Sequence, residues 1–200
     1  EETAAAGGWR DAVAAIAADP GIDEVILSGG DPLSLATPKL AELTDALAGV
    51  PHLRRLRIHS RLPIVLPERV DDEFIAWLGA LPWATSVVVH ANHGNEFDAS
   101  VAAAMTRLRH AGATLLNQAV LLRGVNDSEQ ALADLCERGF DAGVLPYYLH
   151  QLDRVAGAAH FEVSDAAALD LHRALLHRLP GYLVPKLVRE VAGDASKRPL

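Results

Sequence analysis

The regular alternation of helical and extended segments is the feature that most restricts the fold of this sequence. Short apolar runs occupy residues 24–28, 53–58, 86–90, 114–122 and 144–149, and helical patterns separate them. These runs recur about every thirty residues, a spacing that is typical of parallel strands joined by right-handed helical crossovers. An open doubly wound sheet and a barrel both fit this alternation.

Polar residues within or just after these runs favour the barrel. They are His59, Arg61, His90, His93, Asn117, Gln118 and Asp153. A barrel gathers the ends of its strands around one mouth, whereas an open sheet spreads them in a row. We therefore predict an α/β fold, a partial (β/α)6 TIM-like barrel of parallel strands.

Composition and charge exclude several classes of protein. Half of the sequence (50%) is hydrophobic, so one domain can bury a sizeable core. The net charge is −8 and no basic block occurs, which argues against nucleic-acid binding. The apolar runs are too short to span a bilayer. The composition predicts a protein with neither a nucleic-acid nor a membrane partner.

The single cysteine, Cys136, restricts both compartment and metal chemistry. One cysteine excludes an internal disulfide and fits a reducing compartment, so we predict a cytoplasmic location. It also cannot build a multi-cysteine metal site by itself. His90 and His93 have no cysteine or carboxylate cluster nearby, so they do not indicate a zinc site, and we assign no metal ligand in this chain.

The stretch Ser28-Gly-Gly-Asp-Pro32 ends the first apolar run abruptly. Two glycines allow positive φ or a close approach of the backbone to a ligand, and Asp31 with Pro32 marks a turn. Parallel α/β folds place their sites at this end of a strand. An ordinary strand-to-helix turn is the alternative reading.

Other polar residues have equally plain alternatives. Asn117 and Gln118 are neighbours in an apolar strand and point to opposite faces, so at least one needs a polar partner. Arg61 can hold a carboxylate or phosphate, or face water. Asp153 can pair with a cationic substrate or begin a helix. Lys197 reads as a solvated tail lysine unless it is buried, where it can bond a carbonyl cofactor.

Seven motifs occur in a fixed order and carry a family resemblance. They are Ser28-Gly-Gly-Asp-Pro32, Arg57-Ile-His-Ser-Arg61, His90-Ala-Asn-His-Gly-Asn-Glu96, Asn117-Gln-Ala-Val-Leu-Leu-Arg-Gly-Val-Asn-Asp127, Pro146-Tyr-Tyr-Leu-His-Gln-Leu-Asp153, Gly157-Ala-Ala-His-Phe161 and Gly181-Tyr-Leu-Val-Pro-Lys186. This set resembles the radical S-adenosylmethionine aminomutases of the lysine 2,3-aminomutase type. The ending Gly193-Asp-Ala-Ser-Lys197 has no polyglycine run and is most similar to the branch that makes (R)-β-lysine for modification of elongation factor P.

The resemblance implies roles for individual residues. The residues matching the S-adenosylmethionine segment are Ser28, Gly29, Gly30 and Asp31. Those matching the lining of the cofactor mouth are Arg61, His90 and Gln118. Lys197 matches the catalytic lysine that bonds pyridoxal 5′-phosphate. Asp153 and Glu190 match two acids that hold the distal ammonium of the substrate lysine.

The resemblance further implies a reaction and its cofactors. The amino group of L-lysine moves from C2 to C3, and the cofactors are S-adenosylmethionine, pyridoxal 5′-phosphate and a [4Fe–4S] cluster. The cluster ligands are absent from this chain. We therefore expect a fragment that lacks the first barrel strand and the cluster loop, and that is inactive alone. Residues 1–192 would form the partial barrel and residues 193–200 a C-terminal segment with the cofactor lysine.

The same resemblance implies partners for the protein, and two alternative functions remain open. It implies lysine as the small-molecule substrate and a functional link to elongation factor P and its lysyl ligase, and it leaves the oligomeric state open. One alternative is a stand-alone lysine or glutamate 2,3-aminomutase. The other is a cluster-free barrel that binds a phosphorylated ligand and has no catalytic activity.

Overall fold

The computed structural model describes residues 9–153, 156–191, 193–194 and 196–200. Its strands form one seven-stranded sheet in sequence order. They are β1 (Glu24–Leu27), β2 (Arg55–Ser60), β3 (Ala84–Val89), β4 (Thr114–Val120), β5 (Leu145–His150), β6 (Lys186–Arg189) and β7 (Arg198–Pro199). Strands β1 to β6 are parallel, and β7 is antiparallel to β6.

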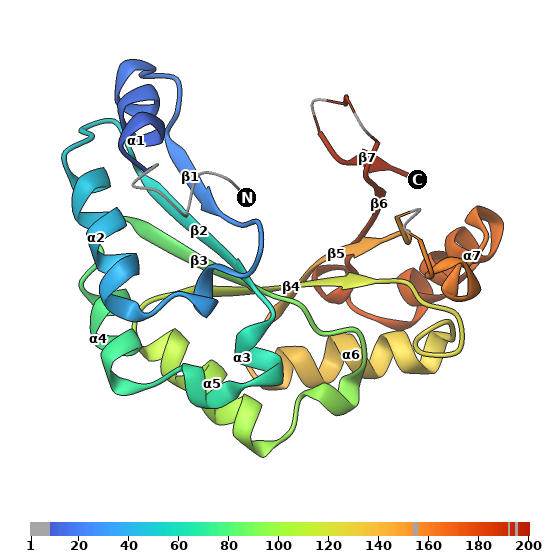
Figure 1. Cartoon of the computed structure of the whole chain (residues 1–200). Helices are drawn as coiled ribbons and strands as arrows, with labels where there is room; N and C mark the ends of the chain where they lie inside the picture. The colour runs from blue at the N-terminus through green and yellow to red at the C-terminus, as the bar shows by residue number, and fades with distance from the viewer. Residues whose placement is uncertain (1–8, 154–155, 192, 195) are drawn as a thin grey trace.

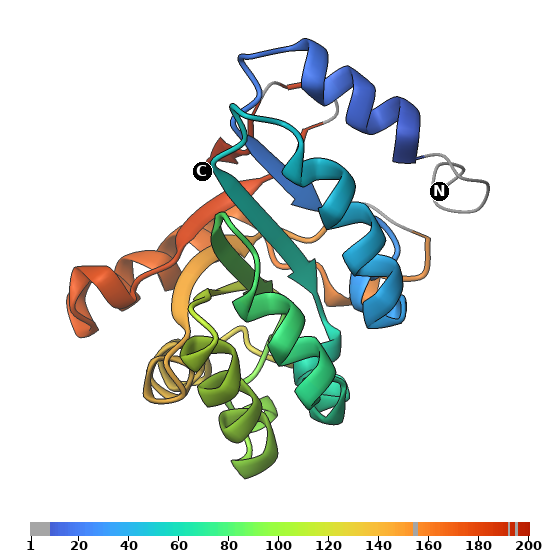
Figure 2. The same cartoon turned by 90° about the vertical axis from the view of Figure 1, so that its left-hand side faces the viewer.

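The sheet curls into part of a barrel, and helices lie against its convex side (Figures 1 and 2). They are α1 (Trp9–Ala18), α2 (Thr37–Ala48), α3 (Leu62–Val65), α4 (Asp72–Gly79), α5 (Ala99–His110), α6 (Glu129–Asp141) and α7 (Asp165–Arg178). β1 and β7 are the edges of the described sheet. The predicted partial barrel of parallel strands is confirmed. None of the helices in the described ranges is long and apolar enough to cross a membrane.

Alternation along the strands separates the core from the concave face. Leu56 and Ile58 of β2 are fully buried and belong to the main hydrophobic core with residues of the covering helices. The residues between and after them, Arg57 and His59, point to the opposite, concave side, because successive side chains of a strand alternate. The core therefore lies between the sheet and the helices, and the concave face is free to carry polar groups.

Strand β5 lies inside the sheet and is irregular at its start. Pro146, which has no N–H to donate, stands opposite Asn117, and the register with β4 shifts between Asn117 and Gln118. Gln118 consequently pairs with Tyr148. The irregularity determines which aromatic side chain stands beside Gln118.

The C-terminal segment folds back onto the sheet. Val188 of β6 pairs with Pro199 of β7, so the end of the chain lies beside β6. Gly193 lies between the two strands with a φ of 88°, a conformation that glycine adopts without strain. This hairpin brings Lys197 to the sheet. Residues 1–8 lie outside the described residues, and the division at residue 192 stays a prediction.

Candidate functional site on the concave face

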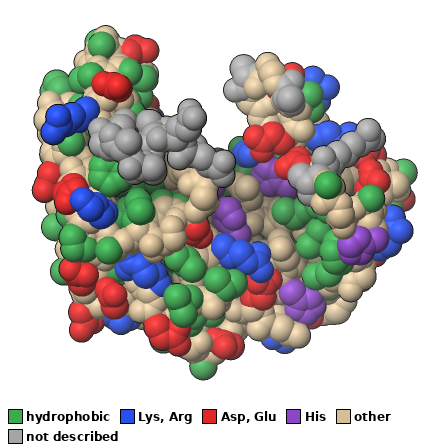
Figure 3. Space-filling model, viewed as in Figure 1, with side chains coloured by type: hydrophobic (Ala, Val, Ile, Leu, Met, Phe, Trp, Pro, Cys, Tyr) green, Lys and Arg blue, Asp and Glu red, His purple; other side chains and the backbone are tan. Residues whose placement is uncertain are grey.

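Polar side chains from four neighbouring strands meet on the concave face of the sheet. The adjacent residues Asn117 and Gln118 of β4 point to opposite faces of the sheet. Asn117 points toward the helices, where its side chain accepts from Ala91 N at 2.9 Å and donates to Ala91 O at 3.0 Å. Gln118 points to the concave side. Figure 3 shows histidine, basic and acidic side chains gathered in the hollow between the two ends of the sheet.

Four buried polar atoms on this face have no hydrogen-bond partner among the described residues. They are His59 Nε2, His90 Nε2, Gln118 Oε1 and His150 Nε2. Burying a polar atom without a partner is costly, so such atoms are rare outside sites that bind something. Their concentration on one face is the strongest structural indication of a ligand site in this chain.

The three histidines of this face are uncharged near neutral pH. Burial lowers the pKa of His59 to about 4 and that of His150 to about 4. Burial also lowers the pKa of His90, against the opposing effect of Asp31. His59 and His90 meet edge to face with ring centres 5.8 Å apart. The face therefore offers neutral imidazoles that can donate or accept a hydrogen bond.

Lys197 lies among these imidazoles. Its Nζ is 3.0 Å from Glu190 Oε2 and 5.7 Å from the centre of the Tyr148 ring. Its positive charge contributes to the lowered pKa of His59, His90 and His150, which places all three near the ammonium. Lys197 is therefore part of the concave face.

The two predicted substrate acids lie near His150. Burial lowers the pKa of His150, and the negative charges of Glu190 and Asp153 offset part of this lowering. The hydrogen bond from Lys197 lowers the pKa of the Glu190 carboxyl. Both acids thus approach the same end of the concave face, with Asp153 exposed to solvent.

The glycine loop after β1 presents open backbone. Gly29 and Gly30 have φ values of 81° and 60°, and a Cβ built on either would meet no atom within 4 Å. Ser28 beside them is exposed. The sequence predicted this conformational freedom, and the space above the loop is large enough for a ligand to approach the main chain.

Asp31 uses both of its carboxylate oxygens within the chain. Oδ1 accepts from Leu33 N at 3.0 Å and from Ser60 Oγ at 2.7 Å, and Oδ2 accepts from Arg61 N at 2.8 Å. These bonds tie the loop after β1 to the loop after β2. A carboxylate has further lone pairs, so Asp31 can hold the loops together and still accept from a ligand.

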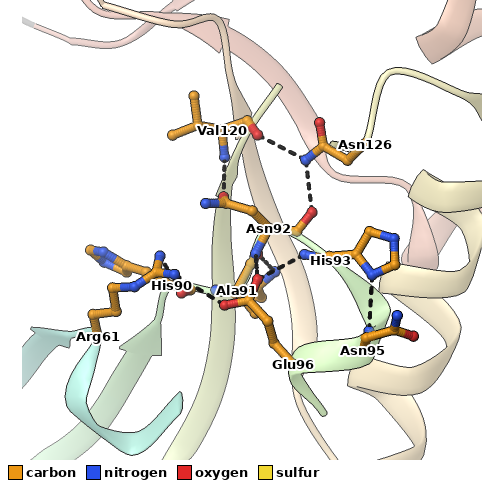
Figure 4. Close-up of polar contacts among 10 residues, drawn as sticks. Arg61, His90, Ala91, Asn92, His93, Asn95, Glu96, Val120 and Asn126 are labelled. Atoms are coloured by element: carbon orange, nitrogen blue, oxygen red, sulfur yellow. Dashed lines mark hydrogen bonds and ion pairs between the residues drawn. The ribbon is translucent and has the colours of Figure 1, made fainter. Parts of the chain in front are cut away.

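Arg61 is engaged with the loop after β3. Its Nη2 lies 3.1 Å from Glu96 Oε2, and its Nη1 donates to His90 O at 3.3 Å (Figure 4). Glu96 Oε1 in turn accepts from the backbone N–H groups of Asn92 and His93 at 2.6 and 2.9 Å. Arg61 and Glu96 therefore determine where His90 lies.

Asn126 holds the same loop from the other side. Its Nδ2 donates to Asn92 O at 2.8 Å and to Val120 O at 2.9 Å (Figure 4). Its Oδ1 accepts from Leu122 N at 2.7 Å. Asn92 Oδ1 accepts from Val120 N at 2.8 Å. Sequence reasoning missed Glu96 and Asn126 as supports of the site. Their positions inside two of the motifs were the only signal.

Arg57 forms a second contact that the sequence did not indicate. Its guanidinium bonds the Glu24 carboxylate at 3.2 and 2.8 Å and the Tyr147 hydroxyl at 3.3 Å. These groups come from β1, β2 and β5, so the contact crosses the concave face.

Known proteins resemble this chain in fold and in sequence. No family model matches the sequence. The solved structure of a radical SAM methyltransferase from Sphaerobacter thermophilus shares the fold, with a TM-score of 0.60 and 16% identity over 95% of this chain and 57% of that one. This chain therefore shares the partial-barrel fold of that structure.

Curated relatives define the family more narrowly. L-lysine 2,3-aminomutase of Escherichia coli K12 is 52% identical over 192 residues, which are 96% of this chain and 56% of the relative. The Haemophilus influenzae enzyme of that name is 50% identical over 94% of this chain and 56% of the relative. The Clostridium subterminale enzyme is 34% identical over 90% and 43%. The chain belongs to the L-lysine 2,3-aminomutase family, and it spans about half the length of these relatives.

Proposed function

We propose that the complete protein is a radical SAM enzyme that converts L-α-lysine into (R)-β-lysine by moving the amino group from C2 to C3. The observation that carries the proposal is the 52% identity to the Escherichia coli L-lysine 2,3-aminomutase over 96% of this chain. Because the chain spans 56% of that relative, the activity is assigned to the complete protein rather than to these residues alone.

S-adenosylmethionine fits the loop after β1 and the unpartnered atoms beside it. The open backbone at Gly29 and Gly30 admits the methionine end of the molecule, which Ser28 and Asp31 flank. When bound and reduced, S-adenosylmethionine supplies the group that abstracts hydrogen from C3 of the substrate. The residues of this chain would orient S-adenosylmethionine. His90 would be one of them, and Arg61 holds the His90 backbone in place.

Gln118 and the neutral imidazoles add polar contacts to the same face. Each has a buried atom that a ligand can satisfy without bringing a charge. Neutral groups neither repel a cationic sulfonium nor neutralise a carboxylate. They therefore suit the binding of a zwitterion such as S-adenosylmethionine or lysine.

Pyridoxal 5′-phosphate fits the position of Lys197. The lysine amine lies on the concave face next to the Tyr148 ring, where a planar aromatic cofactor has an aromatic neighbour. When bound, the cofactor supplies a conjugated carbonyl through which the substrate nitrogen can migrate. Lys197 would hold the cofactor on the same concave face that the glycine loop borders.

A [4Fe–4S] cluster does not fit the residues of this chain. Its single cysteine, Cys136, is buried in α6, and burial raises the pKa of the thiol to about 12. No group of three His, Cys, Asp or Glu side chains among the described residues is placed to hold a metal. We therefore propose that the 200 residues alone are inactive.

The acids near His150 favour lysine over glutamate as the substrate. Glu190 and Asp153 present negative charge to this end of the face. A distal ammonium is attracted there, whereas a distal carboxylate is repelled. The specificity of the enzyme would therefore come from these two side chains.

The ending of the chain supports a more specific role. Gly193-Asp-Ala-Ser-Lys197 has no polyglycine run, the feature that the sequence resemblance associates with modification of elongation factor P. We propose that (R)-β-lysine passes to a lysyl ligase acting on that factor, in the cytoplasm.

The test is a product assay on the protein encoded by the complete gene, with iron, sulfide, dithionite, S-adenosylmethionine and pyridoxal 5′-phosphate supplied. β-Lysine should form from L-lysine, and no β-glutamate from L-glutamate. The 200-residue chain under identical conditions should form neither. Absence of β-lysine from a protein that binds all its cofactors would contradict the proposal.

A further inference from the structure

A β-bulge in β5 puts two consecutive tyrosines on the same face of the sheet. Asn117 stands opposite Pro146, whereas the next residue of β4 stands opposite Tyr148. Tyr147 is therefore the extra residue of the bulge. Successive side chains of a regular strand point to opposite faces, but the rings of Tyr147 and Tyr148 pack together with centres 3.9 Å apart and planes 39° apart. A bulge re-aims a side chain in this way, and bulges are frequent beside functional sites.

Arg57 reaches Tyr147 from the other side of the concave face. Its Nη1 donates to the Tyr147 hydroxyl at 3.3 Å, while its Nε and Nη2 bond the two carboxylate oxygens of Glu24 at 3.2 and 2.8 Å. Strands β3 and β4 lie between β2 and β5 in the sheet. Backbone hydrogen bonds join only adjacent strands, so this side-chain contact adds a link across the curvature of the sheet.

The ion pair gives this link a fixed geometry and no net charge. A guanidinium that meets a carboxylate through two nitrogens is restricted in orientation as well as in position. The Arg57 and Glu24 side chains are only 19% and 28% exposed, which limits competition from water. Burial is the main cause of the lowered pKa of His59, and the charge of Arg57 adds to the lowering while that of Glu24 opposes it. The two charges therefore offset each other at the histidines.

Tyr148 carries the effect of this link to Lys197. The Tyr148 ring packs against that of Tyr147, and its centre lies 5.7 Å from Lys197 Nζ. We propose that Arg57, held by Glu24, is a positioning residue that fixes this tyrosine pair and so sets where an aromatic ring lies beside the Lys197 amine. Arg57 acts through the two tyrosines.

The consequence for the cofactor rests on the proposed function. A planar cofactor held by Lys197 has Tyr148 as its aromatic neighbour, and the contact between two aromatic rings depends on their separation and tilt. Loss of the link from Arg57 changes the position of that neighbour without removing any group that contacts the cofactor. The spectrum of the bound cofactor should therefore change while its occupancy does not.

The first test observes the tyrosines in the complete protein with no cofactor added. Tyrosine is replaced by meta-fluorotyrosine, and the fluorine NMR signals are assigned with Tyr147→Phe and Tyr148→Phe. Arg57→Gln loses the two-nitrogen contact with Glu24 and should move the signals of both tyrosines. Tyr147→Phe loses only the hydroxyl that Arg57 bonds and should move the Tyr148 signal.

The matched control is Arg55→Gln. Arg55 lies two residues earlier on β2 and pairs with Asp23, with both side chains almost half exposed. Its replacement should leave the signals of Tyr147 and Tyr148 in place. The Tyr182 signal serves as an internal reference, because Tyr182 is 61% exposed and should not move in any of these variants.

The second readout is the circular dichroism of pyridoxal 5′-phosphate bound to the complete protein. The free cofactor is achiral, so the band reports on the asymmetry of its surroundings. Arg57→Gln and Tyr147→Phe should each reduce the band at unchanged occupancy. The double variant should lose no more than the more affected single variant, because both changes break one contact.

A Tyr148 signal that stays in place in either folded variant, an equal shift in Arg55→Gln, or losses that add in the double variant would overturn the proposal. Far-ultraviolet circular dichroism checks the fold. If Arg57→Gln does not fold, Tyr147→Phe decides, because it keeps the ring. A native protein without a cofactor band would contradict the proposed function, whereas the fluorine NMR would still decide the role of Arg57.

Discussion

The side chain of Asn126 donates to the backbone oxygen of Asn92 at 2.8 Å and so joins the loop after β4 to the loop after β3. Asn126 is fully buried, with 0% of its surface exposed, and both ends of its amide are bonded. The loop that follows His90 is therefore held by a residue more than thirty positions away in the sequence. The positions of the candidate ligand atoms depend on such contacts.

Replacing Asn126 with alanine should destabilise the fold, because three backbone groups lose their partner in the interior. The expected loss in the free energy of unfolding is about 1–3 kcal/mol, measured by urea denaturation. Asn95→Ala, at a position where the amide only meets Arg138 at the surface, should cost less than about 0.5 kcal/mol. A similar loss for both variants would show that Asn126 does not support the loop.

Glu96→Gln should be tolerated better than Glu96→Ala. Glutamine keeps an oxygen for the N–H groups of Asn92 and His93, and loses only the charge that faces the partly exposed Arg61. We expect a cost below about 1 kcal/mol for glutamine and about 1–3 kcal/mol for alanine, by urea denaturation. Equal costs would mean that the ion pair, and not the backbone contacts, holds the loop.

Gly29→Ala should cost about 1–2 kcal/mol of stability, because its φ of 81° strains any residue with a Cβ. It should also weaken S-adenosylmethionine binding, since the methyl group enters the open space above the loop. Gly49→Ala is the matched control, because Gly49 has a φ of −74° at the end of α2. Isothermal titration and urea denaturation measure the two effects. Unchanged affinity in a folded Gly29→Ala protein would contradict the assignment of this loop.

Stability should fall as the pH decreases from about 6.5 to about 4. The folded state holds the pKa of His59 and of His150 below the ordinary 6.5, so the unfolded chain binds more protons in this window. Protonation therefore favours unfolding. His150→Gln should flatten the pH dependence of the free energy of unfolding, and His110→Gln, at an exposed position, should not. An unchanged slope in His150→Gln would contradict the buried, neutral imidazole.

Cys136 should resist thiol reagents in the folded chain, because burial raises the pKa of its thiol to about 12. Labelling with iodoacetamide at pH 8 should be slow in buffer and fast in concentrated urea. The chain has one cysteine, so the measured rate reports on this residue directly. Rapid labelling of the native chain would show that the helix α6 packs less tightly than described.

The sequence predicted the barrel because its strand spacing and apolar alternation are local properties of the chain. It also indicated the glycine loop, where two glycines adopt positive φ as expected. The sequence could not show that Asp31 and Arg61 form hydrogen bonds with neighbouring loops. Those contacts depend on the curvature of the sheet.

The approach of Lys197 to the concave face had no local signal either. It depends on a hairpin between β6 and a two-residue strand near the end of the chain. The family resemblance pointed to this lysine, and the hairpin explains physically how it reaches Tyr148. The roles assigned to the site residues stay predictions until ligands are bound.

The central claim is that Lys197 is the amine that holds a carbonyl cofactor on the concave face. The most direct measurement is to incubate the complete protein with pyridoxal 5′-phosphate, reduce it with borohydride and locate the label by peptide mass spectrometry. Lys39 and Lys186 are the other lysines of this chain and serve as internal controls. The account predicts a label concentrated on Lys197. A label divided equally among the three lysines, or absent from Lys197, would contradict it.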